Sequence, residues 1–208
     1  MKILNLYAGI GGNRKNWDGE KHDITNVEIN QEIAEVLRDN FPEDEVIVGD
    51  AHKYLIENYE DFDFIWASPP CPTHSSIRKA GAKNGQYDPK YPDMKLWQEI
   101  IFLDTFFEGD WVVENVASYY IQPVEPQRRN EHYFWSNFSI PEISLGNQIH
   151  NDGNVSKWEN YYGFDLSDYS FQSVEKRKVL RNCVHPRLGK AILESRNEKQ
   201  QNLMEVEA

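Results

Sequence analysis

The chain has 208 residues, of which 39% are hydrophobic and 13% aromatic, and its formal net charge is −12. This length accommodates one sizeable hydrophobic core and excludes two comfortable ones, so we expect a single compact domain. No apolar stretch is long enough to cross a bilayer, and the first residues read as a core strand and lack the pattern of a signal peptide. We therefore expect a cytoplasmic protein that does not act at a membrane.

Positive charge is concentrated in two segments despite the acidic total. Residues 76–95 carry five basic and two acidic side chains, and residues 175–190 carry six basic and one acidic. A single charge run is more often a solvated face than a binding site. Two runs that flank the same candidate site favour a track for phosphate groups.

Apolar runs alternate with segments of helical periodicity along the first half of the chain. The pattern predicts strands at 2–7, 46–48, 62–67 and 110–116 and helices through 31–37, near 52–58 and at 94–107. Such alternation predicts an α/β fold with a mostly parallel sheet and helices on both faces. Ligands of these folds gather at the carboxyl ends of strands, the expected places of Gly9, Glu28, Asp50, Cys71 and Glu114.

The second half of the chain changes character. We expect residues 1–137 to form the core, 138–175 an irregular insertion, 176–196 a C-terminal helix that returns to the core, and 197–208 a disordered tail. Pro186 is placed to open the returning helix.

The segment from Tyr7 to Gly12 follows the first strand, and its glycines would let the backbone approach a bound nucleoside closely. Glu28 stands nineteen positions after Gly9, where a carboxylate can accept from ribose hydroxyls. Asp50 could accept from an adenine amino group or could cap the helix that follows it, and the sequence leaves both open. The glycines do not spell GxGxxG, which disfavours a pyrophosphate ligand.

Cys71 lies between Pro70 and Pro72, just after a predicted buried strand. A lone cysteine at a strand end is most often inert, but the two prolines fix the backbone around it and favour a nucleophile. Cys183 is the other cysteine, and neither belongs to a CxxC pair, so we expect two free thiols. Glu114 ends another buried strand, where it could donate a proton to a ring nitrogen or could pair with Arg129.

Seven motifs occur together and in a fixed order: Tyr7 to Gly12, Val27 to Asn30, Gly49-Asp50, Pro70-Cys71, Glu114-Asn115-Val116, Pro126 to Arg129, and Asn182 to Pro186. With them the chain resembles the DNA cytosine-5 methyltransferase family over residues 4 to about 193. It looks like a compact member of the type found in phages, and the resemblance implies a restriction–modification context, although the sequence does not reveal whether the enzyme works alone or beside a nuclease.

The resemblance implies that Cys71 adds to C6 of cytosine, that Glu114 holds N3, and that Arg129 supports the base and the adduct. S-adenosyl-L-methionine would donate the methyl group to C5, and loss of the C5 proton would then expel the thiol. The implied partner is double-stranded DNA with the target cytosine flipped out. The implied substrate-binding residues are Ser75, Arg78, Lys79, Asn115 and Val116, and the loop 72–93 would close over the base.

The same resemblance implies a cofactor pocket in which Tyr7 stacks on adenine, Glu28 holds the ribose and Asp50 contacts adenine. The other residues of this implied pocket are Gly9, Gly11, Gly12, Ile29, Ala51, Pro69, Asn182 and Cys183. No metal is implied, and we expect a monomer.

The chain departs from the family pattern at three places. Pro72 replaces the usual glutamine, Arg181 replaces the glycine before the terminal asparagine, and the second arginine of the paired-arginine motif appears as Glu131 or His132. The segment 138–175 stands where the target recognition domain would be and is small for one. A short or relaxed recognition sequence is therefore expected.

Three other functions compete with this interpretation. A zinc nucleobase deaminase would need an HxE motif and a CxxC motif, and both are missing. A tRNA cytosine-5 methyltransferase of the same family would use the same cysteine and glutamate. A non-catalytic binder of DNA or cofactor would tolerate loss of Cys71.

Overall fold

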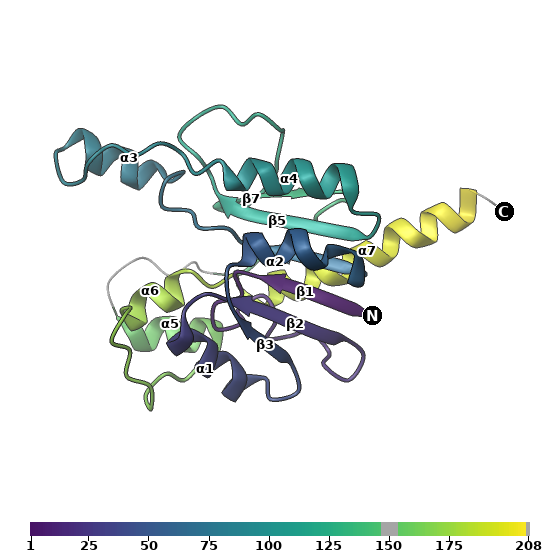
Figure 1. The fold of residues 1–208 in the computed structure, drawn as a ribbon, viewed down its shortest axis with the longest axis horizontal. Helices are drawn as coiled ribbons and strands as arrows, with labels where there is room; N and C mark the ends of the chain where they lie inside the picture. Colours follow the sequence, from purple (N-terminus) through teal and green to yellow (C-terminus); the bar gives the residue numbers. More distant parts are fainter. Residues whose placement is uncertain (147–153, 207–208) are drawn as a thin grey trace.

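The computed structural model describes residues 1–146 and 154–206, with side chains as far as residue 196 (Figure 1). Within these residues seven strands form one sheet in the order β3-β2-β1-β4-β5-β7-β6. The strands are β1 Lys2–Leu6, β2 Asp23–Glu28, β3 Glu45–Val48, β4 Phe64–Ala67, β5 Asp110–Val116, β6 Gln127–Arg129 and β7 His132–Ser136. Neighbouring strands from β3 to β5 are parallel, whereas β7 is antiparallel to both β5 and β6. The predicted α/β fold with a mostly parallel sheet is confirmed.

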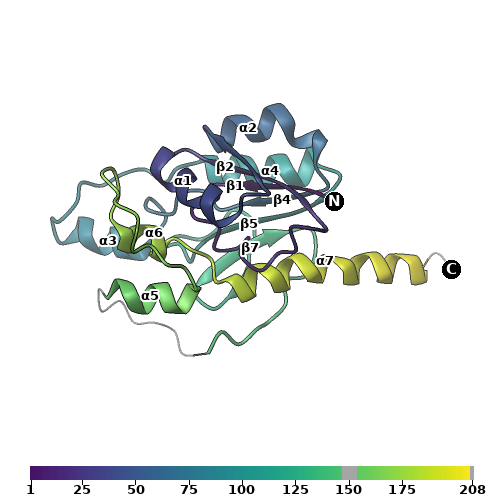
Figure 2. The ribbon, with the colours of Figure 1, turned by 90° about the horizontal axis from the view of Figure 1, so that it is seen from below.

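Helices cover both faces of the sheet. They are α1 Gln31–Asn40, α2 Ala51–Asn58, α3 Ser76–Lys83, α4 Lys95–Phe106, α5 Val155–Tyr162, α6 Lys176–Arg181 and α7 Pro186–Val206, with a 3₁₀ turn at Tyr59–Asp61. Figure 2 shows α2 and α4 on one side of the sheet and α7 on the other. Helices α1, α5 and α6 share a separate apolar cluster with Ala8 and Ile10 of the turn after β1. None of the helices in the described residues has the length and hydropathy of a membrane span.

Alternating side chains of the central strands belong to opposite layers. Leu4 and Ile65 pack with α2 and α4 in one cluster, while Ile3 and Phe64 pack with α7 in the other. All four are 0% exposed. Because both faces of these strands are buried, their sequences are apolar almost throughout, which is why the runs could be recognised as strands.

The structure adds elements within segments that were expected to be irregular. Helix α3 lies inside the expected loop 72–93, and α5 lies inside 138–175, of which residues 147–153 lie outside the described part. Helix α7 continues to Val206, so most of the stretch that we expected to be disordered has a helical backbone here, and residues 207–208 are not described. The division of the chain into four segments remains a prediction.

Candidate active site

The ends of β4 and β5 bring Cys71 and Glu114 to one edge of the sheet. Ala67 at the end of β4 pairs with Val113, so Glu114 is the next residue of the neighbouring strand. The side-chain amide of Asn115, which is 1% exposed, donates to the carbonyl oxygen of Pro69 at 2.9 Å. This buried bond ties the turn that carries Cys71 to the end of β5.

The sulfur of Cys71 meets opposing electrostatic influences. Burial raises the pKa of the Cys71 thiol, and the nearby carboxylate of Glu114 raises it further. The cations of Arg181 and Lys178, both on α6, lower it. Since the thiolate is the nucleophile, these two cations are the groups that favour the reactive form.

Alkylation of Cys71 by iodoacetamide tests this balance. We expect the rate to rise with pH up to a midpoint above the ordinary range of a cysteine, because the resting thiol is protonated at neutral pH. The double variant K178Q/R181Q should move the midpoint upward, since the thiolate loses both cations. The readout is mass spectrometry of the Cys71 peptide between about pH 7 and 10.

The matched control is K53Q/K190Q, which removes two exposed lysines that pair with Glu57 and Glu194. It should leave the midpoint in place. If K178Q/R181Q leaves the midpoint where it is or lowers it, the cations of α6 do not act on Cys71 as described.

Glu114 is 7% exposed, and its carboxylate is bonded to a histidine. Nδ1 of His132 and Oε1 of Glu114 lie within hydrogen-bonding distance. In the antiparallel register Val116 faces His132 and Glu114 faces Phe134, so Glu114 and His132 are diagonal neighbours on one face. Of the two residues that could stand for the second arginine of the family motif, His132 is the one that contacts Glu114.

Arg129 does not contact Glu114. Its guanidinium donates to the backbone carbonyl oxygens of Ile140 and Pro141, with Nε to Ile140 O at 3.0 Å. The alternative in which Glu114 pairs with Arg129 is therefore wrong, because His132 takes the carboxylate and the segment after β7 takes the guanidinium. Support of a bound base by Arg129 remains a prediction.

The expected substrate-side residues lie on α3 and at the end of β5. Ser75 caps α3 by accepting from the Arg78 amide at 3.4 Å and forms a β-bridge with Ser118. The Arg78 guanidinium lies over the ring of Tyr87, and the Lys79 ammonium over that of Tyr119, each at 5.0 Å. Figure 1 shows α3 projecting beyond the sheet. Val116 is the last residue of β5.

The ends of β1 and β2 form the expected cofactor end of the site. The amide of Gly9 donates to Oε2 of Glu28 at 2.9 Å, and the amide of Asn30 donates to Oε1 at 2.8 Å. Gly9 has a φ of +56° and would have nothing within 4 Å of a Cβ, while Ile29 is 70% exposed. These features fit an adenosine moiety, because Gly9 leaves open space, the Glu28 carboxylate has free lone pairs and Ile29 exposes an apolar side chain.

Gly11 and Gly12 are required by packing within the protein. A Cβ on Gly11 would lie 2.4 Å from the ring of Phe41, and one on Gly12 would lie 2.6 Å from the carbonyl oxygen of Val184. These contacts join the turn after β1 to α1 and to the segment before α7. The space at these two glycines is therefore filled by the chain itself, whereas Gly9 faces open space.

Replacing Gly12 by alanine should destabilise the protein by about 1–3 kcal/mol, because a rigid backbone carbonyl blocks the new methyl group. Urea unfolding measures the change. The control is Gly49→Ala, where the nearest atom to the new Cβ is 4.0 Å away. Equal stability of both variants would show that the contact between Gly12 and Val184 is not tight.

Tyr7 takes part in a buried cluster that the sequence did not reveal. Its hydroxyl is bonded to Oε1 of Glu99, which is 0% exposed, and Nδ1 of His52 lies 2.9 Å from the same oxygen. Burial, followed by the charge of Glu99, raises the pKa of Tyr7, so the phenol stays neutral and donates. The hydroxyl of Tyr7 is thus committed to α4, and stacking of its ring on adenine remains a prediction. The sequence did not reveal Glu99 because a glutamate in an apolar helix does not indicate which strand end its side chain will contact.

Asp50 acts as a helix cap. Its carboxylate accepts from the Lys53 amide at 3.2 Å and lies 3.6 Å from the ammonium of Lys95. The capping interpretation is therefore observed, and contact with adenine remains a prediction for the carboxylate, which is 46% exposed. Ala51, the first residue of α2, is 3% exposed and belongs to the core.

Asn182 and Cys183 differ in their surroundings. Asn182 ends α6 and is exposed. Cys183 is buried, its sulfur lies 3.6 Å from the Val179 carbonyl oxygen, and burial raises its pKa to about 12. Cys183 is thus an inert thiol that packs against Gly12, and the C-terminal wall of a cofactor pocket remains its predicted role.

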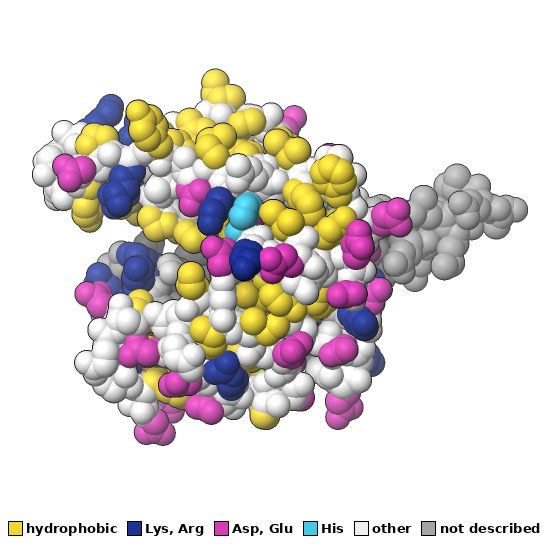
Figure 3. All heavy atoms as spheres, in the orientation of Figure 1, with side chains coloured by type: hydrophobic (Ala, Val, Ile, Leu, Met, Phe, Trp, Pro, Cys, Tyr) yellow, Lys and Arg dark blue, Asp and Glu magenta, His cyan; other side chains and the backbone are white. Residues whose placement is uncertain are grey.

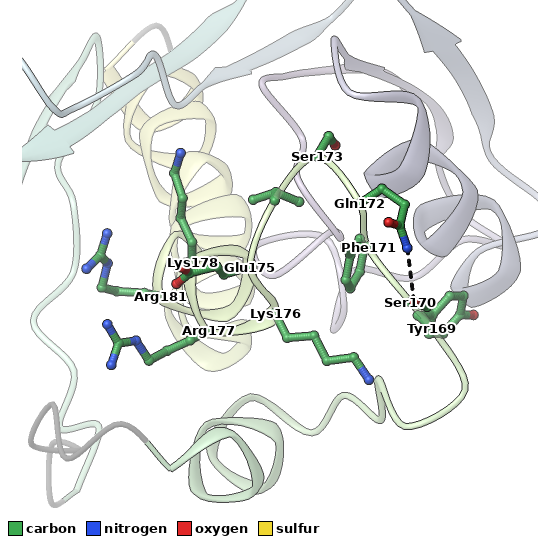
Figure 4. Close-up of a pocket in the computed structure, with 11 residues that line it drawn as sticks. Tyr169, Ser170, Phe171, Gln172, Ser173, Glu175, Lys176, Arg177, Lys178 and Arg181 are labelled. Atoms are coloured by element: carbon green, nitrogen blue, oxygen red, sulfur yellow. Dashed lines mark hydrogen bonds between the residues drawn. The ribbon is translucent and has the colours of Figure 1, made fainter.

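A basic cavity of about 910 Å³ lies between α6 and the segment before it. Figure 4 shows Arg177 and Arg181 extending to one side of α6 and Lys176 to the other, where its ammonium is bonded to the Leu166 carbonyl. Arg177, Lys178 and Arg181 form no ion pair with any residue that the structure describes. In Figure 3 the surface is hollowed between the lobes of α3 and α6, and Lys and Arg side chains gather on both.

The profile of C-5 cytosine-specific DNA methylases matches residues 1–119 of this chain. The chain belongs to this family. The match includes Cys71 and Glu114, whereas Arg129, His132 and Cys183 follow it along the chain. No curated protein matches the chain.

Several solved structures are similar. A mutant form of the DNMT2 protein of Spodoptera frugiperda is 27% identical over 55% of this chain and 35% of its own, with a TM-score of 0.40. The methyltransferase EhMeth of Entamoeba histolytica is 12% identical over 92% of this chain and 95% of its own, with a TM-score of 0.51. A putative DNA modification methyltransferase encoded in a prophage of E. coli is 16% identical over 65% of this chain and 46% of its own, with a TM-score of 0.44.

The matches cover different shares of these structures. The chain spans about a third of the DNMT2 structure and nearly all of EhMeth. The likeness to EhMeth shows a shared fold.

Proposed function

We propose that this protein transfers a methyl group to C5 of cytosine in DNA through a covalent bond between Cys71 and C6 of the ring. The observation that carries the proposal is the meeting of a thiol and a carboxyl at the ends of two neighbouring parallel strands. A thiolate can add to an electron-poor ring, and a carboxyl across the cleft can steady the nitrogen that receives the displaced electrons.

The proposed reaction uses two side chains of the protein, Cys71 and Glu114. Cys71 adds to C6 as its thiolate, the C5–C6 electron pair moves through C4 to N3, and Glu114 gives N3 a proton. S-adenosyl-L-methionine, when bound, supplies the methyl group that C5 acquires. Loss of the C5 proton to a base then expels the Cys71 thiolate, and the N3 proton returns to Glu114.

The residues that would hold S-adenosyl-L-methionine are those at the ends of β1 and β2. Glu28 would accept from the ribose hydroxyls, and Ile29 would cover the adenine. The open turn at Gly9 would let the protein backbone approach the ligand closely. Glu28 suits this role because the amides of Gly9 and Asn30 hold its carboxyl at the strand end. Burial raises the pKa of Glu28, and these two hydrogen bonds oppose the rise.

The substrate that we propose is double-stranded DNA. The cations of α6 and α3 stand on either side of the hollow seen in Figure 3, where they would contact phosphates. The target cytosine would leave the duplex, at a cost of a few kcal/mol, to reach the thiol. We propose that a single copy of the chain acts on a short or relaxed target sequence.

Expression in a host that lacks cytosine methylation tests the proposal. Bisulfite sequencing of the host DNA should show C5-methylcytosine in a short context, and the Cys71→Ser variant should show none. Methylation confined to a site of six or more specified base pairs would contradict the relaxed target, though not the reaction.

The purified protein separates the competing functions. Methyl incorporation into tRNA and not into duplex DNA would establish the tRNA enzyme instead. Tight binding of DNA with no methyl transfer to either polymer, and full cellular function of Cys71→Ser, would establish a non-catalytic binder.

A further inference from the structure

The bond between His132 and Glu114 gives the proposed acid a second group from which to take a proton. The two side chains lie on adjacent antiparallel strands, β7 and β5, on the same face of the sheet. The side chain of Glu114 is 9% exposed and that of His132 is 35% exposed, so the histidine is the more solvent-accessible member of the pair. A proton can therefore reach Glu114 through the imidazole.

The charges around the pair favour the protonated form of the histidine. Burial lowers the pKa of His132, but the charge and the hydrogen bond of Glu114, together with the charge of Glu131, outweigh burial, so the net direction is upward. The ionisable groups near the pair come from every neighbouring element: Glu114 on β5, Arg129 and Glu131 in the β6–β7 hairpin, Cys71 after β4, Tyr162 on α5, and Lys178 and Arg181 on α6.

These surrounding groups do not compete for the proton. Burial raises the pKa of Tyr162, so its phenol stays neutral, and the Arg129 guanidinium is held by the carbonyls of Ile140 and Pro141. The proton of this hydrogen bond is therefore shared between Nδ1 of His132 and the carboxyl group of Glu114.

We propose that His132 is a positioning residue that fixes the Glu114 carboxyl and supplies the proton that Glu114 passes to N3 of cytosine. The inference rests on the proposed function. As the Cys71 thiolate bonds to C6, the proton on Nδ1 of His132 passes through the Glu114 carboxylate to N3, so His132 becomes neutral and Glu114 is again a carboxylate. When the thiolate leaves, the N3 proton returns through Glu114 to His132, so no proton is gained or lost by the pair.

This role predicts a specific pH profile. The reaction needs thiolate at Cys71, which increases with pH, and imidazolium at His132, which decreases with pH. At pH values between the raised pKa of His132 and the raised pKa of Cys71, the increase in thiolate cancels the decrease in imidazolium. The single-turnover rate of the wild type should therefore be nearly independent of pH in this range.

His132→Arg is the decisive variant because arginine keeps the positive charge and cannot release its proton. Its rate should be lower than that of the wild type and should rise by about tenfold per pH unit over the same range, following Cys71 alone. His132→Gln, which keeps a hydrogen-bond donor without a charge, should show the same slope. His22→Gln, at the start of β2, is the matched histidine control and should keep the flat profile.

A second readout does not depend on methyl transfer. In NMR titrations the His132 ring should protonate with a midpoint above the ordinary histidine range, and Glu114→Gln should lower that midpoint. A midpoint that Glu114→Gln leaves unchanged would overturn the pairing.

The outcomes separate this inference from the proposed function. Wild-type methyl transfer that requires Cys71, combined with the same pH profile for wild type and His132→Arg, would overturn the role of His132 alone. The absence of methyl transfer by the wild type to any cytosine polymer would overturn both.

Discussion

Replacement of Cys71 by serine is expected to lower methyl transfer to duplex DNA by at least about a thousandfold. The serine hydroxyl is far less ionised than a thiol at any pH near neutrality, so the bond to C6 does not form. Cys71 is half-buried at the end of β4 and contributes little to the core, so the variant should unfold at nearly the wild-type urea concentration. Transfer of a labelled methyl group under single-turnover conditions is the measurement.

The matched control for this variant is Thr73→Ala, two residues along the same turn. It removes the hydroxyl that accepts from the Asp93 amide at 3.0 Å and leaves the sulfur in place. Its effect should be less than about tenfold. Activity of Cys71→Ser within tenfold of the wild type would mean that the reaction does not pass through a bond to this residue.

Replacement of Glu114 by glutamine is expected to lower methyl transfer by about 10²–10⁴-fold, because an amide keeps the shape of the carboxyl and carries no proton to N3. The same change should accelerate alkylation of Cys71 at a fixed pH, since removal of the carboxylate charge lowers the pKa of the thiol. The two rates should therefore move in opposite directions in one variant.

Slower methyl transfer together with faster alkylation distinguishes loss of an acid from general damage to the site. General damage would slow both reactions or leave the alkylation rate of Cys71 unchanged. Glu131→Gln is the control, because Glu131 also acts on His132 but is exposed and contacts neither the thiol nor Glu114 in the described structure. Methyl transfer by Glu114→Gln at the wild-type rate would exclude the carboxyl from the reaction.

Strands β1, β3, β4 and β5 and helices α1, α2 and α4 could be predicted because both faces of the sheet are covered, whereas no strand range was predicted for β2, β6 or β7. Continuous apolar runs such as the one ending at Ala67 identify buried parallel strands, and the polar residues after them identify strand ends. Helix α3 could not be predicted from its polar, lysine-rich sequence. It is stabilised by the cap at Ser75 and by contact of Arg78 with Tyr87, which a search for apolar periodicity does not detect.

The location of the candidate site residues could be predicted from the sequence, but most of their contacts could not. Cys71 and Glu114 could be placed at one sheet edge because they end strands that pair with each other. The bond from His132 to Glu114 depends on the register of an antiparallel strand, which the sequence did not fix. The need for glycine at position 12 depends on Val184, a contact across most of the chain length.

The most direct test of the covalent mechanism uses duplex DNA with 5-fluorocytosine at a sequence shown to be methylated, incubated with the protein and S-adenosyl-L-methionine. Fluorine at C5 cannot leave as a proton does, so the enzyme should remain bonded to the base. Peptide mapping by mass spectrometry should then find the nucleotide on Cys71. A modified sequence that yields no adduct, or an adduct on another residue, would contradict the account.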